Sequence, residues 1–166
     1  MARKPRILIV NCYSDNHRGA RGNPWIMPQS IAPAVLAGML HPGRVDIRLA
    51  CEFRNGPFED LGALQWAELL VLTGLNPAFD RMKQVTAHAS TVNPGIVVVI
   101  GGPLARMLPT LGRRYFDYVC SGDVEQLAAV VDAVFGPGHA AELPCPRHDL
   151  LPGSRIIGYA EASRNC

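Results

Sequence analysis

Short apolar runs bounded by turn residues recur along the first 136 residues of the chain. Four of them are apolar almost throughout and only four to six residues long, which is typical of parallel strands buried on both faces. They are Arg6–Asn11, Leu69–Thr73, Ile96–Ile100 and Tyr118–Ser121. A fifth run, Val45–Cys51, alternates apolar and polar residues, and this alternation predicts an edge or half-exposed strand.

Helical periodicity occupies the segments between these runs. Apolar residues at helical spacing predict helices over Pro28–Leu40, Pro77–Ala89 and Val124–Phe135. Shorter helices are predicted over Phe58–Trp66 and Ala105–Leu111. Strands that alternate with helices form a parallel sheet through right-handed crossovers. We therefore expect an α/β fold of the flavodoxin-like (Rossmann-like) class, doubly wound, with a five-stranded parallel sheet in the order 2-1-3-4-5.

The character of the chain changes after Phe135. A Gly-Pro-Gly turn and further prolines follow, and no regular period returns until Arg155–Ala160, which could form one more short strand. Such a stretch is typical of a linker or strap. The expected organisation is an α/β ligand-binding domain over residues 1–136 and a strap over residues 137–166 that leads toward another part of a longer protein.

Composition narrows the classes of function. The 166 residues are 48% hydrophobic with a formal net charge of +2, which suits one well-filled core and offers no basic cluster for a nucleic acid. No apolar run is long enough to span a membrane, and the run after the basic start is too short for a signal peptide, so a cytoplasmic protein is expected. The five cysteines contain no C-x-x-C pair, which argues against a disulfide framework and a self-contained zinc site.

Candidate ligand-binding residues follow the predicted strands, because ligands of open parallel sheets bind beyond the carboxyl ends of the strands. Glycines at these places let the backbone approach a bulky planar ligand closely. A hydroxyl can form a hydrogen bond with a buried heteroaromatic group. Asp123 is also expected to cap the last helix, with Glu125 in its first turn. The candidates are Cys12, Tyr13, Ser14, Thr73, Gly74, Leu75, Gly101, Gly102, Pro103, Ser121, Gly122, Asp123 and Glu125.

The order and spacing of these motifs resemble a known family. Thr73-Gly74-Leu75 before a helix, then Gly101-Gly102, then Gly122-Asp123-x-Glu125, are similar to the cobalamin-binding domains that precede radical S-adenosylmethionine barrels. The resemblance implies that Thr73 contacts the nucleotide tail of cobalamin and that Gly74 leaves room for it. It further implies that the candidate residues above bind the cofactor and that a radical S-adenosylmethionine domain follows in the same parent chain.

A histidine near the first strand raises the question of the lower cobalt ligand. Asp15-x-His17 is similar to the Asp-x-His motif of cobalamin carriers of the methionine synthase and mutase type, in which the histidine ligates cobalt. The radical branch usually lacks this residue. His17 therefore stays open between a cobalt ligand and an exposed loop histidine.

The last residues carry the other half of the resemblance. Ser163-Arg164-Asn165-Cys166 is similar to the Ser-Arg-Gly-Cys segment whose cysteine is the first of three that hold a 4Fe–4S cluster, on which S-adenosylmethionine binds. Asn165 replaces the usual glycine, and the two further cysteines do not follow. One thiolate cannot hold a cluster, so Cys166 would be a ligand only in an intact parent enzyme.

Three functions are compatible with the sequence. The first is a cobalamin-binding module of a radical S-adenosylmethionine enzyme, most often a methyltransferase, in which this part binds the cofactor and supplies no general acid or base. The second is a free-standing corrinoid carrier or sensor with His17 on cobalt. The third is a flavodoxin-like module without cobalamin, although no G-x-G-x-x-G or P-loop motif is present to bind phosphates.

Overall fold

The computed structural model describes residues 3–13 and 30–151. Three of the predicted site residues, Ser14, His17 and Cys166, lie outside the described residues, and so does the possible strand at 155–160. Within the described ranges, no helix combines the length and apolarity needed to cross a membrane.

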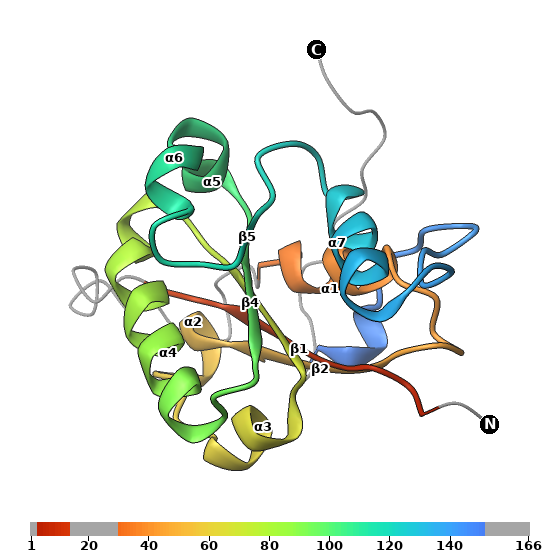
Figure 1. Cartoon of the computed structure of the whole chain (residues 1–166), viewed down its shortest axis with the longest axis horizontal. Coiled ribbons are helices and arrows are strands. Elements are labelled where there is room, and N and C mark those ends of the chain that lie inside the picture. Colours follow the sequence, from red (N-terminus) through yellow and green to blue (C-terminus); the bar gives the residue numbers. More distant parts are fainter. Residues whose placement is uncertain (1–2, 14–29, 152–166) are drawn as a thin grey trace.

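One parallel sheet forms the centre of the molecule (Figure 1). Its order is β2-β1-β3-β4-β5, which confirms the predicted flavodoxin-like α/β class. The strands are β1 (Arg6–Asn11), β2 (Asp46–Cys51), β3 (Leu69–Thr73), β4 (Val97–Ile100) and β5 (Tyr118–Val119). The alternating strand β2 lies at an edge, as its pattern predicts.

Helices cover both faces of the sheet (Figure 1). On one side lie α1 (Ala32–Gly38) and α7 (Gln126–Phe135), and their apolar residues share a core cluster with one face of the strands. The other core lies under α3 (Leu61–Trp66), α4 (Phe79–Val92) and α5 (Pro103–Met107). We call these two sides the α1/α7 face and the α3/α4 face. The remaining short elements are α2 (Glu52–Asn55), α6 (Pro109–Gly112) and the 3-10 turns η2 (Asn76–Ala78) and η3 (His148–Leu150).

Strand alternation assigns each residue of a strand to one of these faces. In β1, Ile7 and Ile9 belong to the core on the α1/α7 face, whereas Leu8 and Val10 belong to the core on the α3/α4 face. The same alternation holds in β3 and β4. It places the last residue of each strand on a defined side of the sheet, which matters for the site described below.

Most predicted helices differ from the structure by a few residues at their ends, and two predicted elements differ for a clear physical reason. The single helix expected over Ala105–Leu111 is two short helices, α5 and α6, because Pro109 has no amide hydrogen to continue the first. The last strand ends at Val119 instead of Ser121. Beyond it the Gly122 amide donates to the side chain of Gln126 at 2.9 Å, so this amide is turned away from sheet pairing.

The described part of the strap, residues 137–151, packs back against α1. Leu40 forms an antiparallel bridge with Ala140, and the His41 amide donates to the His139 carbonyl at 2.7 Å. Further along, the Arg147 amide donates to the carbonyl of Ala34 at 2.9 Å. This stretch is therefore a folded part of the α/β domain, and any linker begins after it.

Gly38 is where α1 and the strap come closest, and it gives a stability prediction. A Cβ atom at Gly38 would overlap the backbone carbonyl of Cys145 and approach the Cα of Pro146 at 3.1 Å. Gly38→Ala is therefore expected to displace the strap and to lower the free energy of unfolding by about 1–3 kcal/mol. Urea denaturation measures the loss, and limited proteolysis detects the freed strap. Gly95→Ala is the control, because the nearest atom to its Cβ would be 3.8 Å away; equal stability of the two variants would contradict the prediction.

Candidate functional site at the carboxyl edge of the sheet

Small or polar side chains end all five strands on the α1/α7 face. Below them this face is formed by larger residues such as Ile9, Val71 and Val99. Asn11 is in register with Cys51 on one side and with Thr73 on the other, and backbone hydrogen bonds extend the pairing past the ends of β4 and β5. We call the resulting set the carboxyl row: Cys51, Asn11, Thr73, Gly101 and Cys120.

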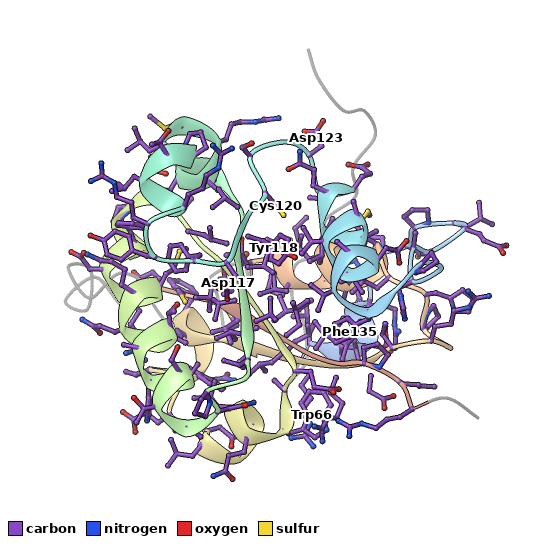
Figure 2. The ribbon with its side chains drawn as sticks, viewed as in Figure 1. Trp66, Asp117, Tyr118, Cys120, Asp123 and Phe135 are labelled. Atoms are coloured by element: carbon purple, nitrogen blue, oxygen red, sulfur yellow. The ribbon has the colours of Figure 1, made fainter. Side chains whose placement is uncertain are left out.

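The carboxyl row lies at one end of the layer between the sheet and its two covering helices, where the strands end. Both α1 and α7 follow parallel strands, so their N-termini point to this edge. Tyr118 and Cys120 project from the β5 end toward α7 (Figure 2), where both pack against the core of the α1/α7 face. A ligand entering between α7 and the sheet would meet the row first.

Two polar side chains of the row are buried with few partners. Thr73 is 5% exposed, and no residue in the described ranges forms a hydrogen bond with its hydroxyl. Asn11 is 8% exposed, and its side-chain nitrogen donates only to the Cys51 sulfur, at 3.5 Å. No described residue donates to the Asn11 side-chain oxygen. Both groups therefore keep hydrogen-bonding capacity that a ligand could use.

The glycines of the site differ in what surrounds them. Among the described residues, the nearest atom to a Cβ at Gly101 would be the Cβ of Cys120, 3.8 Å away, so a small side chain there would meet no clash with them. Gly102 has a φ of +99°, which only glycine adopts without strain, and a Cβ there would lie 3.5 Å from the Thr73 hydroxyl oxygen. Gly74 has a different reason from the predicted one: its Cβ would meet the Cys12 carbonyl oxygen at 2.6 Å. The close approach of the Cys12 carbonyl therefore explains why a glycine stands at position 74, and no room is left there for a ligand.

Cys12 and Tyr13 lie apart from the carboxyl row. The Cys12 side chain belongs to the core on the α3/α4 face and is 3% exposed, although its amide donates to the Thr73 carbonyl at 2.7 Å. The Tyr13 ring packs edge-on against Phe53, with 4.9 Å between the ring centroids. The side chain that β1 contributes to the row is therefore Asn11, which the sequence interpretation did not select.

A buried ion pair connects the segments that follow β1, β2 and β3. Glu52 is 5% exposed, and its carboxylate accepts from Arg81 at 2.7 and 2.8 Å. The same carboxylate accepts from the Tyr13 amide at 3.0 Å and from the Phe58 amide at 2.8 Å. One side chain thus fixes the path of the chain as it leaves β1, beside the carboxyl row. Neither Glu52 nor Arg81 was selected from the sequence, because no local pattern marks them.

An apolar surface lies at the α5 side of the sheet, over the α3/α4 face. Leu75 is 72% exposed and Met107 is 67% exposed, and the Asn76 side chain joins them by donating to the Met107 sulfur at 3.3 Å. Leu108 extends this surface at 49% exposed. Pro103, another predicted site residue, is exposed at the start of α5. The Leu75 side chain is therefore apolar and exposed.

The segment after β5 is arranged differently from the prediction. The residue that precedes α7 is Glu125, and no side chain caps this helix. Asp123 instead pairs with Arg106 of α5 at 2.9 Å, across the solvent-exposed edge. The prediction that Asp123 caps the last helix is therefore wrong, because the arginine competes successfully for its carboxylate. Ser121 is half-buried and Gly122 exposed, both beside the β5 end of the row.

Two thiols near the site, those of Cys12 and Cys120, have a raised pKa that favours their neutral form. Burial raises the pKa of the Cys12 thiol, and the nearby Glu52 carboxylate raises it further. Burial likewise raises the pKa of the Cys120 thiol. Since the thiolate is the nucleophile and the metal ligand, these cysteines serve as small packing groups. Across the described ranges, no three His, Cys, Asp or Glu residues cluster closely enough to hold a metal ion.

Comparisons with protein-family models, with curated proteins and with solved structures found no significant match. The function of the chain therefore has to be inferred from this site and from the motif resemblance.

Proposed function

We propose that the chain is a cobalamin-binding module of a radical S-adenosylmethionine enzyme, and that the enzyme transfers a methyl group. The observation that supports cobalamin is the carboxyl row, in which the buried Thr73 hydroxyl lies near the open side of Gly101. The nucleotide tail of cobalamin ends in a flat heteroaromatic base. Such a group needs an apolar site with one or two polar partners, and the row places Thr73 and Asn11 beside an apolar core.

The residues present fit this cofactor in three ways. The Thr73 hydroxyl has no partner among the described residues, Gly101 leaves space beside it, and the positive φ of Gly102 keeps the neighbouring loop free of a side chain. Leu75 offers an exposed apolar contact for the corrin outside the slot. When bound, the cofactor supplies the methyl-transfer chemistry. The chain itself binds the cofactor, orients it and excludes water from its tail.

The radical part of the proposal depends on the sequence resemblance. The segment that contains Cys166 lies outside the described residues. A 4Fe–4S cluster and S-adenosylmethionine would be held by the parent enzyme, in which Cys166 would be one of three cluster ligands. The strap, which contacts α1 as far as Arg147, would connect the two parts.

Titration of the whole chain with hydroxocobalamin tests the proposal. We expect one cobalamin per chain, retained through gel filtration, with a corrin absorption spectrum altered by the protein. Flavin mononucleotide and NAD serve as competing probes for the flavodoxin-like alternative. Protein that elutes colourless after incubation with hydroxocobalamin, or that binds either nucleotide cofactor in its place, would overturn the assignment.

The spacing of Asp15 and His17 favours a second candidate, a corrinoid carrier or sensor with His17 as the lower cobalt ligand. His17→Ala separates the two functions. In the carrier, the visible spectrum of the bound corrinoid changes in this variant, because cobalt loses its imidazole ligand. In the radical-enzyme module, the spectrum stays as in the unsubstituted protein.

A further inference from the structure

We infer that Asn11 is a second cofactor contact, and that Asn11 and Thr73 together select corrinoids that carry a nucleotide arm. The inference rests on the proposed function, since it concerns the same site. It adds a residue that neither the motif resemblance nor the sequence pattern assigns, and it states which part of the ligand that residue recognises.

Asn11 and Thr73 form one binding feature. They are register partners at the carboxyl ends of β1 and β3, adjacent strands about 4.8 Å apart. Alternation places both on the α1/α7 face, because Ile9 and Val71, two positions earlier, belong to that core. An amide and a hydroxyl therefore lie side by side at the end of a mostly apolar layer.

The Asn11 amide is poorly satisfied by the protein. Its only hydrogen bond within the described ranges is a donation to the Cys51 sulfur at 3.5 Å, and sulfur is a weak acceptor. Asn93 shows what a structural asparagine looks like in this fold. Its side-chain nitrogen donates to the carbonyls of Leu64 at 3.2 Å and Ala67 at 2.8 Å, and so joins α3 to the end of α4. Asn11 makes no such connection between elements, and no described residue donates to its side-chain oxygen.

The chemistry of the pair indicates the recognised group. A side-chain amide both donates and accepts, and so does a hydroxyl. Adjacent groups of this kind match a sugar, whose hydroxyls also donate and accept. In cobalamin the ribose belongs to the nucleotide arm, which would enter the slot beside Gly101. A corrinoid that lacks the arm, such as cobinamide, presents nothing to Asn11.

Binding of two corrinoids to three proteins tests the inference. Hydroxocobalamin and diaquacobinamide are titrated into the unsubstituted chain, Asn11→Val and the matched control Asn93→Val. We expect the unsubstituted chain to prefer hydroxocobalamin. Asn11→Val should lose about tenfold in hydroxocobalamin affinity, which corresponds to one lost hydrogen-bonding contact, with diaquacobinamide affinity unchanged. Asn93→Val should keep the preference of the unsubstituted chain.

Thermal unfolding without cofactor supplies a readout that separates a binding role from a structural one. Asn11→Val is expected to raise Tm by about 2–4 °C, because an under-satisfied polar group is replaced by an apolar one. Asn93→Val should lower Tm, because two carbonyls lose their donor.

The failures of the two proposals are distinguishable. If the unsubstituted chain binds neither corrinoid, the proposed function fails. If it binds both but without preference, or if Asn11→Val keeps the preference, only the role of Asn11 fails. A lower Tm or loss of folding in Asn11→Val would make the amide structural and would also overturn the inference.

Discussion

Replacing Gly101 with leucine should weaken hydroxocobalamin binding by about 100-fold, a loss of about 2.7 kcal/mol. Gly101 is the open position of the carboxyl row, where a Cβ would have no neighbour nearer than 3.8 Å. A leucine side chain would fill the space beside the Thr73 hydroxyl, and the nucleotide arm would have to displace it to enter. Absorption or fluorescence titration measures the loss in affinity.

A second glycine, at the other end of β4, provides the matched control. Gly95 precedes β4 at the opposite edge of the sheet, and its Cβ would likewise meet nothing nearer than 3.8 Å. Gly95→Leu should therefore be tolerated equally well by the fold and should leave the affinity unchanged. Circular dichroism confirms that both variants are folded. Tight cobalamin binding by folded Gly101→Leu would show that the arm does not enter beside Gly101.

Glu52→Ala should lower the free energy of unfolding by about 3–5 kcal/mol. The Glu52 side chain is only 3% exposed, and Arg81, its ion-pair partner, is 22% exposed. Truncation removes the acceptor of two backbone amides and leaves the Arg81 charge in a mostly buried position without this carboxylate. A domain of this size has about 5–15 kcal/mol of stability in total, so a large share of it should be lost. Urea denaturation measures the loss.

An exposed ion pair serves as the control, because truncating it should cost little stability when neither charge is buried. In the Arg106–Asp123 pair the side chains are 64% and 70% exposed, and exposed pairs contribute about 0–1 kcal/mol. Asp123→Ala should therefore change the stability only slightly. If Glu52→Ala unfolds the protein completely, Glu52→Gln keeps one acceptor oxygen and should give a measurable, smaller loss. A loss for Glu52→Ala no larger than that for Asp123→Ala would contradict the role of the buried pair.

Residues at the ends of the strands were the part of the candidate site that the sequence could predict. Thr73 and Gly101 were selected because they terminate apolar runs, and parallel strands bring their carboxyl ends to one edge. The choice of Cys12 instead of Asn11 shows what was missing. Both residues end the same run, and only the alternation along β1 decides that Asn11 faces α1 and α7 while Cys12 faces the opposite core. That signal was present in the sequence and could have been used.

Other features of the site depend on residues far apart in the chain. Glu52 and Arg81 are 29 positions apart, and neither has a local pattern that predicts the other. Nothing in the local sequence distinguishes Gly38 from other helix residues, yet the strap residue Cys145 leaves no room for a side chain there. Asp123 was expected to cap a helix, and the approach of Arg106 from another element changed its partner. Each of these outcomes depends on which elements become neighbours.

The sequence by itself determined the class of fold and the strand order, and with them which strand ends meet at one edge. Local periodicity is sufficient for these, because buried parallel strands and amphipathic helices can pack in few arrangements. Only the tertiary structure decided which side chains meet at that edge, that the buried Glu52–Arg81 pair supports it, and that the strap belongs to the domain. Contacts between distant segments depend on distances that are set when the layers pack, and no short stretch of sequence contains those distances.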